Sequence, residues 1–248
     1  MRKGWQGAVL KVYGAKDFQV EVLDVQPVTE RFVRVRARGP ELLAATEWHP
    51  TMWVRLWFTD DHGKPHQRAY TVIDPQPDGT FSMDVHVHDG PAARALAGAQ
   101  PGQVLDATLQ GSRFTVPEGA VEHLHLVGDA ASIPAIRTVL DAMPHTPATV
   151  WLEEQEPSES RIPVTERADV DVRRIERGSE AEGNLGLVLV EHTTGDWAAR
   201  AHNGEDLSQH WFWLAPEASA CRILSRFLRQ EVQVPKERIT ALAYWRAA

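Results

Sequence analysis

The chain has 248 residues, of which 43% are hydrophobic and 24% are charged; this balance is typical of globular domains and excludes a disordered chain. The formal net charge of -8 at pH 7 argues against nucleic-acid binding, which usually requires a basic surface. The single cysteine, Cys221, excludes an intrachain disulfide and a cysteine-ligated iron–sulfur cluster, so redox chemistry would need an organic cofactor or another kind of metal site.

The sequence shows neither a secretory signal peptide nor a membrane-spanning segment. No apolar run of signal-peptide length follows Met1, and no stretch approaches the roughly 20 apolar residues of a membrane span. We therefore expect a cytoplasmic protein without a membrane partner. We also expect a monomer, because no apolar heptad pattern is present.

The first half of the chain alternates apolar and polar residues, which predicts strands over 20–25, 32–36, 52–58, 68–73, 81–88 and 103–109. Residues 52–58 are the clearest case, with Met52, Val54, Leu56 and Phe58 on one face and Trp53, Arg55 and Trp57 on the other. Residues 91–99 predict a short helix with Pro91 in its first turn. Short strands separated by turn residues indicate an antiparallel β-barrel.

The second half alternates short apolar strands with helices. Strands are predicted over 123–127, 149–152, 170–175, 211–214 and 239–244, helices over 132–142 and 218–232, and an acidic loop over 153–160. This alternation indicates an open, mostly parallel sheet in an α/β domain. The pattern changes near residues 117–119, so we expect a barrel domain over residues 1–117 and an α/β domain over 118–248.

The sequence Arg68-Ala69-Tyr70-Thr71-Val72 is the sharpest candidate site. Alternation places Arg68, Tyr70 and Val72 on one face of a strand. A guanidinium group can make two parallel charge-assisted hydrogen bonds to a pyrophosphate, and a tyrosine can pack against a flavin ring. The alternative is a half-exposed strand with an ordinary arginine and tyrosine.

Residues 84–94 hold a second candidate. Gly90 and Pro91 would begin a helix whose free backbone N–H groups could receive a phosphate; a plainly capped helix is the alternative. Asp84, His86 and His88 alternate along the preceding strand, so a metal site is another reading. We expect no metal, because a closed site needs further ligands that the sequence does not supply.

In this order along the chain, residues 68–72, His86 with 90–92, residues 128–136, 213–217 and 244–246 resemble the siderophore-interacting proteins, FAD-binding members of the ferredoxin-reductase-like superfamily. The resemblance implies an FAD-binding barrel followed by an NAD(P)H-binding-like domain. It implies FAD contacts for the matching residues Arg68, Tyr70, Thr71, Val72, His86, Pro91, Ala92, Ala93, Asp129, Ala131 and Trp245. Arg55 and Arg246 match basic positions that would attract an anionic ferric siderophore.

The function implied by the resemblance is FAD-dependent reduction of ferric siderophores, with release of Fe(II) for iron assimilation. The flavin carries the chemistry, so no catalytic side chain is expected. Substitutions in the second domain, including Ala130, Ala131, Pro216 and Ala247, leave the electron donor open between NADPH, NADH and a ferredoxin. The alternatives are a general flavin reductase or electron-transfer module, a non-enzymatic siderophore or flavin binder, and a zinc enzyme using His86 and His88.

Overall fold

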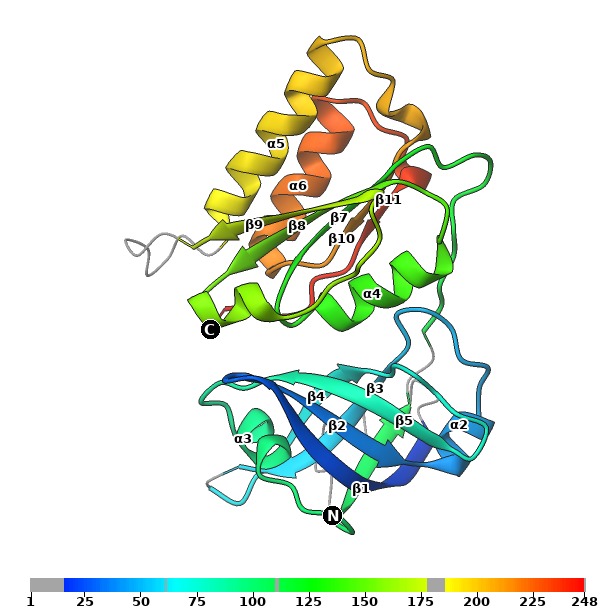
Figure 1. Cartoon of the computed structure of the whole chain (residues 1–248), viewed down its shortest axis with the longest axis vertical. Helices are drawn as coiled ribbons and strands as arrows, with labels where there is room; N and C mark the ends of the chain where they lie inside the picture. Colours follow the sequence, from blue (N-terminus) through cyan, green and yellow to red (C-terminus); the bar gives the residue numbers. More distant parts are fainter. Residues whose placement is uncertain (1–15, 61, 110–111, 178–185, 248) are drawn as a thin grey trace. The chain divides into compact units, whose positions relative to one another are not determined.

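A computed structural model of the chain describes residues 16–60, 62–109, 112–177 and 186–247. Contacts divide the chain into two compact units, Met1–Phe114 and Thr115–Ala248. Figure 1 shows a curled antiparallel sheet in unit 1 and a parallel sheet flanked by helices in unit 2. The fold class predicted from the sequence, a β-barrel followed by an α/β domain, is confirmed.

Unit 1 is a six-stranded antiparallel sheet with the strand order β4-β3-β6-β1-β2-β5. Its elements are β1 (Lys16–Thr29), β2 (Phe32–Arg38), α2 (Pro40–Ala44), β3 (Trp53–Thr59), β4 (Pro65–Thr71), β5 (Thr80–His86), α3 (Pro91–Ala97) and β6 (Val104–Leu109). Just beyond β4, the backbones of Ile73 and Ser82 exchange two hydrogen bonds of 2.9 and 2.8 Å. This link joins the two ends of the sheet and curls it into a half-closed barrel.

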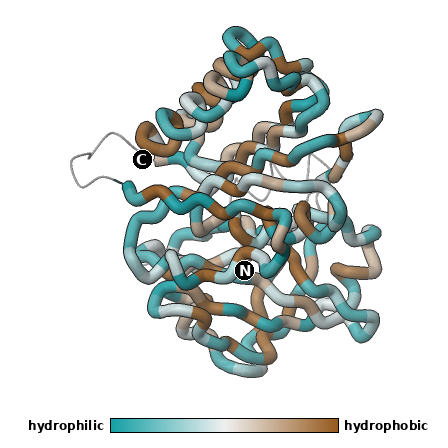
Figure 2. The backbone as a smooth tube through the Cα atoms, turned by 45° about the horizontal axis from the view of Figure 1, so that its top comes forward, coloured by the Kyte–Doolittle hydropathy of each residue, from teal (hydrophilic) through white to brown (hydrophobic). Residues whose placement is uncertain are grey.

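The core of unit 1 follows the alternation seen in the sequence. Val54 and Leu56 of β3 are 0% exposed, and Met52 and Phe58 beside them are also buried. Trp57 points to the other face of β3 and is buried as well. Its indole Nε1 is satisfied there, because it donates a 2.8 Å hydrogen bond to Thr108 Oγ1. Figure 2 shows apolar and hydrophilic stretches alternating along the chain.

Unit 2 is a five-stranded parallel sheet with the strand order β11-β10-β7-β8-β9. Its elements are β7 (Leu124–Asp129), α4 (Ile133–Ala142), β8 (Ala148–Glu154), η1 (Pro157–Arg161), β9 (Val170–Glu176), α5 (Leu187–His202), η2 (Leu207–Gln209), β10 (Trp211–Leu214), α6 (Ala218–Gln230), η3 (Lys236–Arg238) and β11 (Ile239–Ala241). Figure 1 shows α5 and α6 on one face of this sheet and α4 on the other. The strand order reverses between β7 and β10, and open α/β sheets bind ligands outside the carboxyl ends of their strands at such a switch point.

Several elements of the structure differ from the sequence prediction: the short helix α2 was not predicted, and β8 and η1 extend into the expected acidic loop over 153–160. The helix α5 was missed because only Leu189, Thr193 and Trp197 are buried along its 16 residues, which is a narrow apolar stripe. The strand β11 ends at Ala241, although we expected it to continue to residue 244. No helix in the described part of the chain combines the length and the apolar character that crossing a membrane requires.

Candidate functional site

The strand β4 carries the arginine and tyrosine singled out from the sequence. It stands at one end of the strand order and pairs with β3, so its outer edge offers backbone N–H and C=O groups to a ligand. The register pairs Arg68 with Leu56 and Tyr70 with Val54. Directly paired residues share a face of the sheet, so Arg68 and Tyr70 lie on the same face, as the alternation predicts. Arg68 is exposed, and its Nη1 donates a 2.8 Å hydrogen bond to the carbonyl of Gln67.

The residues that follow Arg68 are held more tightly. Tyr70 is half-buried against the barrel core, and burial raises the pKa of its hydroxyl well above the usual value. Thr71 and Val72 are buried. Val72 donates a backbone hydrogen bond of 2.8 Å to Met52 and accepts one of 3.0 Å from the indole of Trp48. The segment is therefore rigid from Tyr70 onwards, with a neutral hydroxyl at one end.

Arg55 occupies the opposite face of the β3–β4 pair. The register pairs it with Ala69, so the strands separate it from Arg68 and Tyr70. Its guanidinium carbon lies 4.8 Å from the ring centroid of Trp53, which is within cation–π range. Burial lowers the pKa of the Arg55 guanidinium, although an arginine remains protonated in proteins.

Three buried polar atoms on β3 and β4 have no hydrogen-bond partner among the described residues: Arg55 Nε, His66 Nε2 and Gln67 Oε1. Leaving a buried donor or acceptor unpaired costs about 1–3 kcal/mol, so each such group calls for an explanation. All three lie on one edge hairpin of the barrel. They lie on two faces: Gln67 pairs with Trp57 and so shares the face of Arg55, whereas His66 pairs with Phe58 and shares the face of Arg68 and Tyr70. A ligand on the Arg68 face would therefore meet the unpaired atom of His66 and not those of Arg55 and Gln67.

The segment after β5 is shaped by Gly90. Its backbone N–H donates a 3.0 Å hydrogen bond to His88 Nδ1, and α3 then begins at Pro91, close to the sequence prediction. The side chains of Ala92 and Ala93 are buried in the barrel core. A contact from these two alanines to a phosphate would therefore come from backbone N–H groups.

The histidines at the end of β5 are not joined by Asp84. The Asp84 carboxylate accepts two hydrogen bonds from Arg34, of 2.7 and 2.9 Å. The rings of His86 and His88 are 6.2 Å apart, centroid to centroid. Within residues 16–60, 62–109, 112–177 and 186–247, no group of three or more His, Cys, Asp and Glu side chains is placed to hold a metal ion.

Asp129 anchors the candidate site of unit 2. It is the last residue of β7, and Ser132 Oγ bonds both its backbone N–H and its carbonyl at 2.9 Å. One carboxylate oxygen accepts a 3.0 Å hydrogen bond from the backbone N–H of Ala131, and the other accepts the indole N–H of Trp245. Asp129, Ala131 and Trp245, for which the family resemblance implies flavin contacts, are thus brought together.

The chain around Trp245 is fixed to neighbouring strand ends. Its carbonyl accepts a 3.1 Å hydrogen bond from the N–H of Ala218, and the guanidinium carbon of Arg177 lies 5.8 Å from its ring centroid. Arg177 is ion-paired with Glu153 at the end of β8, and Glu153 also accepts a 3.0 Å hydrogen bond from the N–H of Gly186. These contacts fix the indole at the carboxyl edge of the sheet.

Glu217 caps the helix α6. Its carboxylate accepts hydrogen bonds from the hydroxyl and N–H of Ser219 and from the N–H of Ala220. Burial alone would raise the pKa of Glu217, but these hydrogen bonds outweigh it and lower the pKa below the usual value. A carboxylate at a helix N-terminus is also stabilised by the helix dipole.

Sequence reasoning missed the roles of Glu153, Arg177 and Glu217. An available signal was position: Glu153 is the penultimate residue of β8, Arg177 directly follows β9, and Glu217 directly precedes α6. Arg246, predicted to bind substrate, is exposed next to Trp245. It lines the same groove as three arginines of α6.

Comparisons with known proteins identify the family to which this chain belongs. A family model described as siderophore-interacting protein matches residues 121–248. The mycobactin import ATP-binding/permease protein IrtA of Mycobacterium tuberculosis is 34% identical over 255 residues, which cover 100% of this chain and 28% of that protein. The chain thus spans little more than a quarter of that relative's length. Ferric acinetobactin reductase of Acinetobacter baumannii is 23% identical over 243 residues, covering 93% of this chain and 79% of the reductase.

Solved structures show the same fold. A siderophore utilization protein from T. fusca superposes with a TM-score of 0.75 at 24% identity, covering 94% of each chain. A ferredoxin NADP+ reductase from Neisseria gonorrhoeae with bound FAD and NADP gives a TM-score of 0.65 at 15% identity, covering 92% of this chain and 99% of the reductase. At these identities the likeness concerns the fold alone.

Proposed function

Because the chain belongs to the siderophore-interacting protein family, we propose that it binds FAD through unit 1 and reduces ferric siderophores, releasing Fe(II). When bound and reduced by the electron donor, FAD would supply the electrons that convert Fe(III) in the chelate to Fe(II), and the flavin would return to its oxidised form. Fe(II) is held less strongly than Fe(III) by the oxygen ligands of a siderophore, so reduction releases the metal. No general acid or nucleophile is needed at the iron.

The observation that carries the proposal is the edge hairpin of the barrel. The buried Nε2 of His66, on the same face as Arg68 and Tyr70, lacks a partner among the described residues. The exposed guanidinium of Arg68 and the neutral hydroxyl of Tyr70 stand on the same hairpin. This combination fits FAD, which presents a pyrophosphate, a flat ring and several hydrogen-bonding groups.

We assign the residues of unit 1 by their chemistry. Arg68 would hold the pyrophosphate, because its side chain is exposed and guanidinium groups bind phosphate bidentately. Tyr70 would pack against the flavin ring, and Thr71 with Val72 would present a fixed backbone. His86 and the backbone from Pro91 to Ala93 would complete the site.

In unit 2, Asp129 and Ala131 would border the flavin, and Trp245 would cover part of it. The hydrogen bond from the indole to Asp129 keeps this ring in one orientation. Arg246 is exposed and would attract an anionic chelate, as would Arg55. The donor would be NAD(P)H, bound at the carboxyl edge of the parallel sheet, or a reduced ferredoxin.

One observation favours a second function, that of a general flavin reductase or electron-transfer module. Arg55 lies on the face of the β3–β4 pair opposite Arg68 and Tyr70, and it is packed on Trp53. An arginine held there contributes less to attracting a chelate than a free one. A general reductase would not need Arg55 at all.

The test is an anaerobic reaction between the reduced, FAD-loaded protein and a ferric siderophore. We expect rapid recovery of the oxidised flavin absorbance together with capture of Fe(II) by a chromogenic chelator. Arg55→Gln and Arg246→Gln should slow the reaction with the chelate while leaving reduction of free flavin unchanged. Equal rates in the variants and the parent would favour the general reductase, and an absence of Fe(II) would contradict the proposal.

A further inference from the structure

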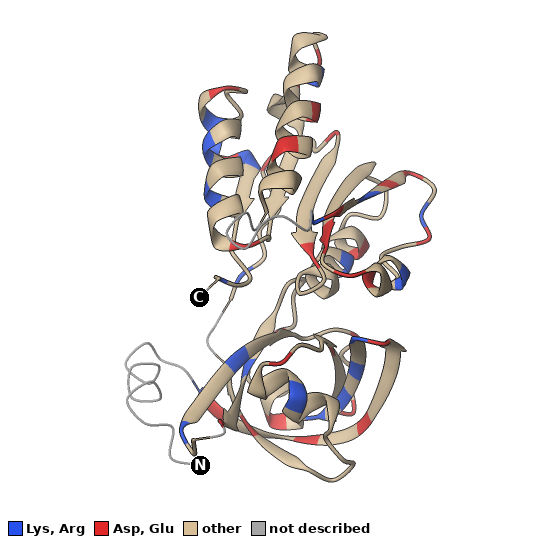
Figure 3. Ribbon diagram, turned by 90° about the vertical axis from the view of Figure 1, so that its left-hand side faces the viewer, with Lys and Arg blue, Asp and Glu red and all other residues tan. Residues whose placement is uncertain are grey.

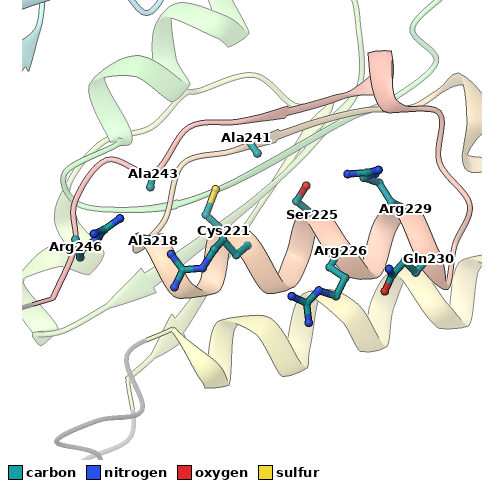
Figure 4. Close-up of a pocket in the computed structure, with 10 residues that line it drawn as sticks. Ala218, Cys221, Ser225, Arg226, Arg229, Gln230, Ala241, Ala243 and Arg246 are labelled. Carbon is teal, nitrogen blue, oxygen red and sulfur yellow. The ribbon is translucent and has the colours of Figure 1, made fainter.

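A second candidate site lies along the helix α6, and its lining residues Ala218 and Arg246 border the segment of Trp245. A groove of about 470 Å³ runs between α6 and the segment from Ala241 to Arg246. Small side chains, including Ala218, Ala241 and Ala243, line part of it. Figure 4 shows Ala218 and Arg246 at one end of the groove and Arg229 at the other.

The rim of the groove is formed by four arginines: Arg222, Arg226, Arg229 and Arg246. All four are exposed, and no acidic residue lines the groove. Their guanidinium groups make no hydrogen bond or ion pair with any residue that the structure describes. Elsewhere in unit 2, Arg174 is paired with a carboxylate instead.

The three helical arginines share one face. They stand at i, i+4 and i+7, which places them in a row about 10 Å long at 1.5 Å rise per residue. Figure 3 shows these basic positions following one another along α6. The chain as a whole has a net charge of -8, so this row is a local concentration of positive charge on an acidic protein.

We propose that this groove binds a small molecule carrying at least two phosphate groups. Guanidinium groups form paired, charge-assisted hydrogen bonds to phosphate oxygens, and those of Arg226 and Arg229 lie about one helical turn apart. A volume of about 470 Å³ falls within the usual range of small-molecule sites, roughly 300–1,000 Å³. The groove shares Arg246 with the proposed chelate site, but the row Arg222, Arg226 and Arg229 has no role in the reductase function proposed above.

The test uses pyrophosphate as the probe, titrated calorimetrically into the purified full chain. The variant is R226Q/R229Q, which leaves Arg246 in place. The matched control is R36Q/R38Q, which removes two exposed arginines from one strand of unit 1 and changes the net charge equally. We expect the Kd to weaken at least about tenfold in the first variant and less than about twofold in the control.

Three results would overturn the proposal. The parent protein does not bind pyrophosphate, the Kd for pyrophosphate weakens equally in both variants, or the protein binds lipid vesicles and not pyrophosphate. The third result is tested by cosedimentation of the protein with phosphatidylglycerol vesicles. If cosedimentation depends on Arg226 and Arg229 and pyrophosphate does not bind, the arginine row of α6 is a membrane contact. The FAD content of each variant is measured in parallel. A protein that binds pyrophosphate but no FAD would support this site and contradict the reductase.

Discussion

The two units treat the polar groups of their candidate sites differently. In unit 1, buried polar atoms of Arg55, His66 and Gln67 have no partner among the described residues. In unit 2, the carboxylates of Asp129 and Glu217 are each bonded to nearby groups of the same unit, while the buried Nε of Arg177 lacks a partner among the described residues. A ligand can gain hydrogen bonds in unit 1 that the folded chain alone does not make.

This difference suggests a division of labour. Binding energy for FAD would come mainly from unit 1, where the ligand satisfies groups that are costly to leave unpaired. Unit 2 would contribute a rigid surface, because its carboxyl edge is already held by internal hydrogen bonds. Four changes test this contrast, from the largest expected effect to the smallest.

The largest loss of stability is expected at the buried ion pair of unit 1. The Asp84 side chain is 1% exposed and is ion-paired with Arg34, so Asp84→Ala would leave a partly buried guanidinium with only a weaker contact to Asp74 at 3.6 Å. We expect the free energy of unfolding to fall by about 3 kcal/mol. Chemical denaturation of the purified variant measures the loss.

The control for Asp84 is Asp171→Ala in unit 2. That side chain is 56% exposed and is paired with Arg173, so its loss should cost less than about 1 kcal/mol. Similar losses for the two variants would show that the buried pair of unit 1 has no special role.

The next effect concerns FAD affinity. Removing the Arg68 guanidinium should weaken binding of FAD about 30-fold, which corresponds to the loss of charge-assisted hydrogen bonds of roughly 2 kcal/mol. Titration of apoprotein with FAD, followed by flavin fluorescence, measures the change. The control is Arg38→Ala, an exposed arginine of β2. If Arg68→Ala and Arg38→Ala bind FAD equally well, the assignment of Arg68 is wrong.

Unit 2 should be the more sensitive to acid, because it contains a cluster of histidines. His125 Nε2 lies 3.1 Å from His210 Nδ1, and the indole of Trp197 donates to His125 Nδ1 at 3.2 Å. Burial lowers the pKa of all three clustered histidines, to about 4 for His123. A histidine with a lowered pKa in the folded state binds fewer protons there than in the unfolded chain.

The stability supplied by these neutral histidines is therefore complete above pH 6.5 and is lost as the pH falls towards 4. We expect a decrease of about 2 kcal/mol over this range, discounted because His123 is partly exposed. His123→Gln should flatten the dependence, whereas His145→Gln, an exposed position, should not. Denaturation at a series of pH values measures the slope, and identical slopes in all three proteins would contradict the account.

The smallest effect is expected at the cap of α6. Glu217→Ala removes the acceptor for the N–H groups of Ser219 and Ala220, and losing an N-cap costs about 1 kcal/mol. Because this change lies in unit 2, FAD affinity should stay within about twofold of the parent. A large loss of FAD affinity, measured by the same fluorescence titration, would show that unit 2 also supplies binding energy.

The sequence predicted the strands of the barrel well because burial there follows period two. Val54 and Leu56 are fully buried, as the alternation requires. The pattern within a strand does not contain the register between strands, so it could not show that Arg55 pairs with Ala69, on the face opposite Arg68. Register depends on turn geometry and on packing over the whole sheet.

The candidate site of unit 2 was less accessible to sequence reasoning. The contact between Asp129 and Trp245 joins positions 116 residues apart, and only the folded sheet brings them together. The family resemblance indicated both Asp129 and Trp245, but it did not indicate the hydrogen bond between them. The histidine cluster likewise depends on the pairing of β7 with β10.

The most direct test of the central claim is the visible absorbance spectrum of the purified chain, recorded before and after anaerobic addition of NADPH, NADH or a reduced ferredoxin. We predict a yellow protein that one of these donors bleaches and that a ferric siderophore then recolours. A protein that remains colourless after incubation with FAD would contradict the account, because the edge hairpin of unit 1 would then not be a flavin site.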